Sequence, residues 1–167
     1  MKRENKVTVT LLIVYLILLT WIILFKLQFS LSDLVSTRSV NLVPFGESVI
    51  VNGKVSFDEI INNFIVFIPV GIYLGMLKPR WPLWKKLCPV FGISLLYEIL
   101  QFIFAIGASD ITDLITNTTG GLTGIAFVFL ASKILKTRTA KILNTLAGIC
   151  TILVICFLML LIFANYS

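Results

Sequence analysis

The chain has 167 residues, of which 58% are hydrophobic and only 13% are charged, and its mean hydropathy is +1.02. A soluble domain of this size needs far more polar surface, so the composition predicts an integral membrane protein. The chain contains no histidine, which excludes imidazole catalysis and histidine-ligated zinc. We expect neither a metal site nor a cofactor.

Five apolar runs predict an all-α bundle of about five transmembrane helices, forming a single domain over residues 1–167. Each run is long enough for a span, which needs roughly 20 residues. The first run resembles a signal peptide, but it is longer than the usual apolar region of one and no cleavage site follows it. We therefore expect it to remain as the first helix. The predicted spans cover residues 7–25, 60–77, 87–106, 111–130 and 142–163.

One long loop, residues 26–59, joins the first two spans. It is moderately polar, and the segment from Asn41 to Gly46 gives a turn signal among apolar residues. We expect this loop to lie on the membrane surface or to dip into the bundle. In the second span, Pro69 predicts a kink. Gly71 and Gly75 form a G-x-x-x-G pattern that lets a neighbouring helix approach closely.

The basic residues indicate the topology. Eleven of the fourteen Lys and Arg residues lie in three clusters, at the N-terminus and at residues 78–86 and 133–141. The intervening spans place all three clusters on one side of the membrane. The positive-inside rule then puts the N-terminus in the cytoplasm and the C-terminus outside. The loop at 26–59 and a turn predicted at 107–109 are extracytoplasmic. The net charge of +6 thus reflects topology, and nucleic acid is not an expected partner.

The three cysteines, Cys88, Cys150 and Cys156, all fall in predicted spans without a short Cys-x-x-Cys spacing. We interpret them as buried apolar fillers. No disulfide framework follows from their positions.

Polar side chains gather in the predicted outer half of three spans. At 1.5 Å per residue, Glu98 lies about 12 Å below the outer end of the third span, and Gln101 is on the same face. In the fourth span, one helical stripe consists of Asp110, Asp113, Asn117, Gly120, Gly121 and Gly124. Burying such polar groups in lipid is costly unless they pair or face water. We therefore predict a polar, outward-facing cavity between the second, third and fourth spans. The predicted binding residues are Glu98, Gln101, Asp110, Asp113, Asn117, Asn62 and Asn63.

Two interpretations of the aspartates stay open. Asp110 and Asp113 stand where the N-cap and the N3 acid of a helix belong, so capping is a sufficient reason for both. Together with Glu98, they are also candidates for acid–base catalysis or for oxygen ligation of a hard cation. No nucleophile–base pair and no phosphate loop is visible, so the sequence assigns no firm catalytic residue.

Several stretches of the chain resemble the VanZ-like family, from the first span to the fourth. The stretches are Lys26-Leu27-Gln28, Asn41-Leu42-Val43-Pro44-Phe45, residues 62–71, Tyr97-Glu98-Ile99-Leu100-Gln101 with residues 102–108, and residues 109–121. The resemblance implies a multi-pass protein of the bacterial plasma membrane, associated with resistance to teicoplanin-type lipoglycopeptide antibiotics. It also implies that the recurring polar positions of the family are Glu98, Gln101, Asp110, Asp113 and Asn117. Many wider members place an arginine just before the aspartates, and residues 105–109 contain none.

Three functional hypotheses follow. In the first, implied by the resemblance, the protein reduces access or binding of the drug at the outer membrane face. Its cavity would hold a membrane lipid, the lipoglycopeptide or a lipid-linked cell-wall precursor. In the second, it is an intramembrane enzyme that modifies a lipid or lipid-linked precursor through Glu98, Asp110 and Asp113. In the third, it is a small carrier or a structural partner. The sequence does not define the oligomeric state.

Overall fold

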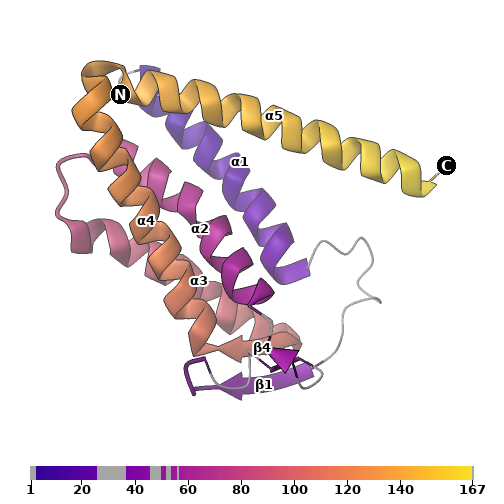
Figure 1. The fold of residues 1–167 in the computed structure, drawn as a ribbon. Helices are drawn as coiled ribbons and strands as arrows, with labels where there is room; N and C mark the ends of the chain where they lie inside the picture. Colours follow the sequence, from indigo (N-terminus) through magenta and orange to yellow (C-terminus); the bar gives the residue numbers. More distant parts are fainter. Residues whose placement is uncertain (1–2, 26–36, 46–49, 52–53, 56, 167) are drawn as a thin grey trace.

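The computed structural model describes residues 3–25, 37–45, 50–51, 54–55 and 57–166, and five long helices dominate this part of the chain (Figure 1). They are α1 (Arg3–Phe25), α2 (Asp58–Leu77), α3 (Leu83–Phe104), α4 (Ile111–Leu135) and α5 (Thr139–Tyr166). The predicted all-α class is confirmed, and each helix overlaps one predicted span. A short 3-10 turn, η3 (Lys136–Arg138), joins α4 to α5, and the chain reverses its direction there (Figure 1).

Four stretches of the described chain are long and apolar enough to cross a membrane. Three of them correspond to α1, α2 and α3. The fourth, Ile111–Leu160, contains α4 and most of α5 on either side of the turn. The protein is thus a multi-pass membrane protein, and the count of five spans stays a prediction.

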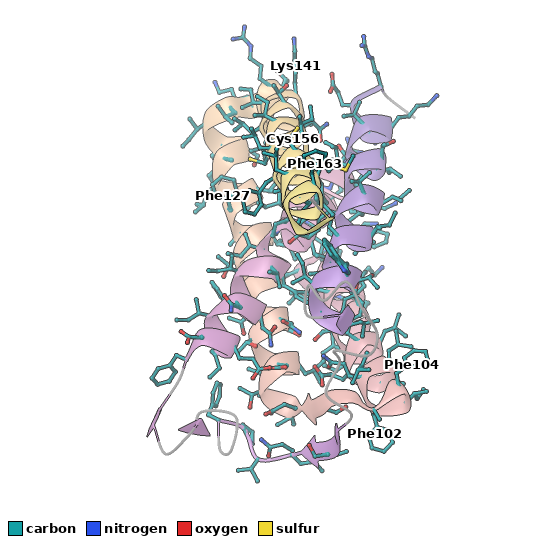
Figure 2. The ribbon with its side chains drawn as sticks, turned by 90° about the vertical axis from the view of Figure 1, so that its right-hand side faces the viewer. Phe102, Phe104, Phe127, Lys141, Cys156 and Phe163 are labelled. Carbon is teal, nitrogen blue, oxygen red and sulfur yellow. The ribbon has the colours of Figure 1, made fainter. Side chains whose placement is uncertain are left out.

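The directions of the helices bring the basic clusters to one end. α2 and α4 run parallel, because Gly71 packs on Gly121 and Gly75 packs on Val128. At the start of α1, the Thr8 hydroxyl donates a hydrogen bond to Asn144 Oδ1 near the start of α5 (3.0 Å). Since α5 follows the C-terminal end of α4, the beginning of α1 lies beside the ends of α2 and α4. Figure 2 shows Lys141 at this end of the molecule, with Phe102 and Phe104 at the opposite end.

α2 and α4 are in contact through their backbones. A Cβ atom at Gly71 would collide with the carbonyl oxygen of Gly121, and one at Gly124 would collide with that of Ile68. Gly120 meets the backbone of α2 in the same way. Lipid gives helices no hydrophobic drive to associate, so close van der Waals contact between small residues is what holds such a pair together. The close approach predicted from the G-x-x-x-G pattern is confirmed, and the glycine stripe of α4 is its partner.

The apolar core lies where α1 and α3 pack on α2. Leu19, Phe67, Val70 and Val90 are completely buried there. α5 diverges from this bundle (Figure 1), and much of its second half is exposed, as at Leu160 (69%).

A parallel pair of strands, which the sequence analysis did not predict, lies at the end opposite the basic clusters (Figure 1). β1 (Thr37–Asn41) pairs with β4 (Ile106–Asp110), with Asn41 opposite Asp110. A second small sheet is the hairpin of β2 (Ile50–Val51) and β3 (Lys54–Val55). The prediction of a turn at residues 107–109 is wrong. This segment is extended because β1 satisfies its backbone hydrogen bonds.

The turn signal in the long loop is confirmed at residues 43–45, where the chain bends and Phe45 has a φ of 57°. Gly46 and residues 26–36 of this loop lie outside the described residues.

The prediction that the cysteines are buried is wrong, because Cys88, Cys150 and Cys156 are all exposed on the helices. The outer face of a transmembrane helix contacts lipid chains that are as apolar as a protein core. A thiol therefore suits the lipid-facing surface as well as the interior, and hydropathy alone does not distinguish the two.

Replacing Gly71 or Gly124 by alanine should destabilise the protein, because the new Cβ would meet backbone atoms of the facing helix. Overpacking of this kind costs about 1–3 kcal/mol, so we expect a clearly lower Tm in detergent micelles. Gly92→Ala and Gly148→Ala are matched controls, since no described atom lies within 4 Å of a Cβ built there, and they should keep or raise the Tm. Wild-type Tm values for Gly71→Ala and Gly124→Ala would contradict the packing.

Candidate functional site

A polar cavity of about 620 Å³ lies among α1, α2, α3 and α4. Its described lining combines four carboxylates and four amides with three apolar side chains, and none of these residues is basic or aromatic. The lining residues are Asp58, Glu59, Glu98, Asp113, Asn62, Asn63, Gln101, Asn117, Ile22, Ile23 and Val66. Six of the seven predicted binding residues are therefore brought together here, and only Asp110 is not.

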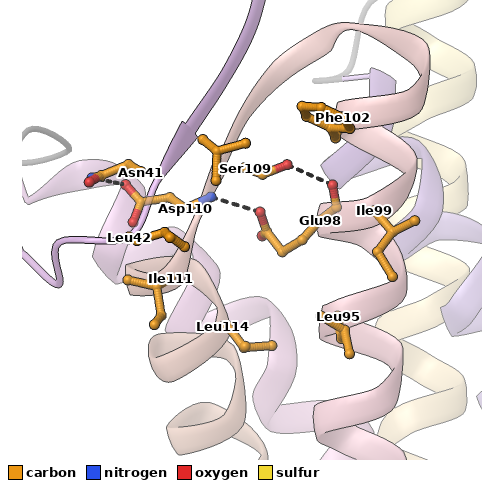
Figure 3. A pocket seen from close by; sticks show the side chains of 11 residues that line it. Asn41, Leu42, Leu95, Glu98, Ile99, Phe102, Ser109, Asp110, Ile111 and Leu114 are labelled. Carbon is orange, nitrogen blue, oxygen red and sulfur yellow. Dashed lines mark hydrogen bonds between the residues drawn. The ribbon is translucent and has the colours of Figure 1, made fainter.

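Glu98 connects α3 to the start of α4. Its side chain is only 8% exposed, and its Oε2 accepts a hydrogen bond from the backbone N–H of Asp110 (2.9 Å; Figure 3). The Ser109 hydroxyl donates to the backbone carbonyl of Glu98 (2.7 Å). A hydrogen bond to a charged group contributes about 1.5–3 kcal/mol, which offsets only part of the cost of burying a carboxylate. Glu98 is thus held in place by the chain that follows α3.

Gln101 and Asn117 are buried amides, and in each only the NH2 group makes a hydrogen bond to a described residue. Gln101 Nε2 donates to the backbone carbonyl of Ile23 (3.3 Å), and Asn117 Nδ2 donates to the Ser94 hydroxyl oxygen (2.9 Å). Among the described residues, Gln101 Oε1 and Asn117 Oδ1 have no hydrogen-bond partner. The carbonyl of Ile23 can only accept, so it fixes the amide orientation of Gln101 with the oxygen unpaired. An unsatisfied buried acceptor costs about 1–3 kcal/mol.

Asp110 is the N-cap of α4. Its Oδ1 accepts a hydrogen bond from the backbone N–H of Thr112 (2.7 Å), and its Oδ2 accepts one from Asn41 Nδ2 (3.0 Å; Figure 3). The sequence left two interpretations open, and for Asp110 the structure agrees with helix capping. Asp113 occupies the first turn of the same helix, where its charge complements the helix dipole, and it also lines the cavity.

An apolar groove of about 330 Å³ lies on the other side of Glu98, against α3, α4 and the end of β1 (Figure 3). Leu95, Phe102 and Leu114 contribute to its walls. Asp110 faces this groove instead of the polar cavity. Glu98 lines both spaces, so a polar compartment and an apolar compartment share one wall.

Several polar residues of this region were not predicted as site residues from the sequence. Asp58 and Glu59 precede Asn62 and Asn63 by four residues, which places each pair on one helical face, so their position was available from the helix period. Ser94 precedes Glu98 by four residues in the same way. Asn41 and Thr112 make contacts between segments that are far apart in the chain. Asn41 bonds to Asp110, and Thr112 Oγ1 accepts a hydrogen bond from the backbone N–H of Phe45 (3.0 Å). No local pattern reveals such contacts.

No group of three or more Cys, Asp or Glu side chains within the described ranges is arranged to hold a metal ion. The cavity instead offers carboxylate and amide oxygens that are distributed over a large volume. This arrangement suits a ligand that carries several hydrogen-bond donors.

The fold defines a small multi-pass α-helical membrane protein with a polar cavity among its helices. The family model described as VanZ/LLP1 matches residues 12–135, and the chain belongs to this family. The chain is similar to Protein VanZ from Enterococcus faecium, with 43% identity over 125 residues that cover 74% of each chain. No solved structure matches it. The family match spans α1 to α4 and includes every predicted binding residue, whereas α5 lies beyond it.

Asn41 and Asp110 should be energetically coupled, because their side chains bond across the β1–β4 pair. A double-mutant cycle with Asn41→Ala and Asp110→Ala should give a coupling of about 0.5–3 kcal/mol in the free energy of unfolding in micelles. As a control, Asn41→Ala and Asn144→Ala change residues at opposite ends of the bundle and should be additive. A coupling near zero for Asn41 and Asp110 would contradict the anchoring of β1.

Proposed function

We propose that this protein confers resistance to teicoplanin-type lipoglycopeptide antibiotics at the outer face of the bacterial plasma membrane. It does so by holding an amphiphile in the polar cavity and the adjoining apolar groove, which reduces access or binding of the drug. The observation that carries this proposal is the position of Glu98, which forms a wall of both spaces. The polar cavity suits the head group of an amphiphile, and the apolar groove suits its acyl chain.

The distribution of charge supports the outward orientation of the cavity. The cavity is lined by Asp58 and Glu59 in the first turn of α2 and by Ile23 near the end of α1. These segments lie at the end of the bundle away from the basic clusters. The positive-inside rule assigns the basic end to the cytoplasm, so the cavity belongs to the outer half of the membrane. Membership of the VanZ/LLP1 family supports the link to resistance.

Binding fits the geometry better than catalysis does. The enzymatic hypothesis requires Glu98, Asp110 and Asp113 to act on one substrate. Asp110 uses both of its carboxylate oxygens in the helix cap and in the bond to Asn41, and it faces the groove, whereas Asp113 faces the cavity. This arrangement favours a binding role over joint catalysis by the three acids.

Glu98→Gln and Asp113→Asn should each lower resistance, because both remove a charge from the cavity while keeping the size of the side chain. Loss of a charge-assisted hydrogen bond weakens binding by roughly tenfold or more. At equal expression, cells carrying either variant should bind more fluorescent teicoplanin and show a lower inhibitory concentration than wild-type cells.

Glu4→Gln is the matched control, since Glu4 lies in the first turn of α1 at the basic end, and this variant should keep full resistance. Full resistance in both cavity variants would contradict the proposal. Mass spectrometry of lipids and lipid-linked precursors should give the same profiles with and without the protein. A new product that depends on Glu98 would favour the enzymatic hypothesis.

A further inference from the structure

The charged side chains in the described lining of the polar cavity are all acidic. Glu98, a lining carboxylate that is only 8% exposed, bonds to a backbone N–H and has no cationic partner among the described residues. Glu59 adds a second carboxylate from α2, and no described lining residue is basic. A carboxylate at this depth in a membrane requires a compensating positive charge or a proton. A cationic ligand would supply that charge.

Two unpaired acceptors indicate what kind of cation fits. Gln101 and Asn117 are only 6% and 2% exposed, and both line this cavity from different helices. Within the part of the chain that the structure describes, Gln101 Oε1 and Asn117 Oδ1 have no hydrogen-bond donor. Buried acceptors are normally paired. The ligand should therefore carry several N–H or O–H donors in addition to its charge.

These requirements favour a primary ammonium group over a metal ion or a trimethylammonium group. A metal ion requires oxygens that converge at about 2.0–2.6 Å, and a cavity of about 620 Å³ is far larger than one ion. A trimethylammonium group has no N–H donor and is typically held by aromatic rings, which are missing from the described lining. A primary ammonium has three donors and one charge, which matches two amide oxygens and a carboxylate.

We infer that the cavity binds the primary ammonium head group of a membrane amphiphile, whose acyl chain lies in the groove beside Glu98. This inference rests on the proposed function and adds the chemical class of the ligand. Glu98 supplies the charge, Gln101 and Asn117 accept N–H bonds, and the apolar groove solvates the chain.

Two phospholipids with identical acyl chains test the inference. Phosphatidylethanolamine has a primary ammonium, and phosphatidylcholine differs from it only by the three methyl groups on the nitrogen. Native mass spectrometry of the purified full-length protein, given both lipids in equal amounts, should show about tenfold preferential retention of phosphatidylethanolamine. Equal retention of the two lipids overturns the inference. Loss of the retained phosphatidylethanolamine on addition of MgCl2 also overturns it, because the cavity would then be a cation site.

Variants assign the retained lipid to the cavity. Glu98→Gln should lose the preference, and Glu59→Gln, which changes an exposed residue and carries little risk of misfolding, should weaken it. Glu4→Gln should keep it. Retention that is unaffected in both cavity variants, or equally lost in Glu4→Gln, overturns the assignment to this cavity. If teicoplanin displaces the lipid, the cavity binds an ammonium group and the drug is an alternative source of that group. If the lipid is retained in the presence of teicoplanin, the lipid is the occupant.

The outcomes separate this inference from the proposed function. Loss of resistance in Glu98→Gln together with equal retention of the two lipids overturns the ammonium assignment and leaves the proposed function standing. Retention of phosphatidylethanolamine that depends on Glu98, with resistance unchanged in both Glu98→Gln and Asp113→Asn, supports the assignment and overturns the proposed function.

Discussion

Backbone contact between α2 and α4 is the constraint on which the rest of the structure depends. Gly71 lies so close to the backbone of Gly121 that a Cβ at Gly71 would collide with the Gly121 carbonyl, and a Cβ at Gly121 would collide with Val90 of α3. Further along the same stripe of α4, towards its N-terminal end, the glycines give way to Asn117 and Asp113. These larger polar residues cannot pack in the same manner, so the helices stay together at one end while a polar space remains at the other. The change from glycine to amide and acid within one helical stripe thus positions the cavity.

The chain around β1 and β4 closes this end of the bundle. Backbone pairing and the bond from Asn41 to Asp110 hold β1 against the junction of α3 and α4, and the Phe45 N–H bonds to Thr112. β1 thereby contributes a wall of the apolar groove. The same junction fixes Glu98 through the backbone N–H of Asp110. One small set of polar contacts therefore builds the groove and orients the carboxylate that separates it from the cavity.

The helices, the G-x-x-x-G contact and the grouping of Glu98 with the α4 stripe could be predicted, because each depends on a period within one helix or on the alternation of spans. The β1–β4 pair could not, since it joins residues about 69 positions apart in the chain, as the bond between Asn41 and Asp110 shows. The mistaken turn at 107–109 follows from the same limit. The different roles of Asp110, which caps α4, and Asp113, which lines the cavity, also depend on this contact. The local sequence allows both residues to cap the helix or both to line a site. The cysteines were misjudged because apolar residues face lipid as readily as a core.

The central claim is that water reaches the cavity from the outer side of the membrane. Val66 and Ile65 are neighbours in α2 at nearly equal depth; Val66 lines the cavity, whereas Ile65 is outside the described lining and 53% exposed. The measurement is labelling of Val66→Cys and Ile65→Cys by a membrane-impermeant thiol reagent on intact cells, after Cys88, Cys150 and Cys156 are replaced by alanine. The account predicts that Val66→Cys is labelled from outside and that Ile65→Cys is protected by lipid. Protection of Val66→Cys, or its labelling only from the cytoplasmic side of inverted vesicles, would contradict the account.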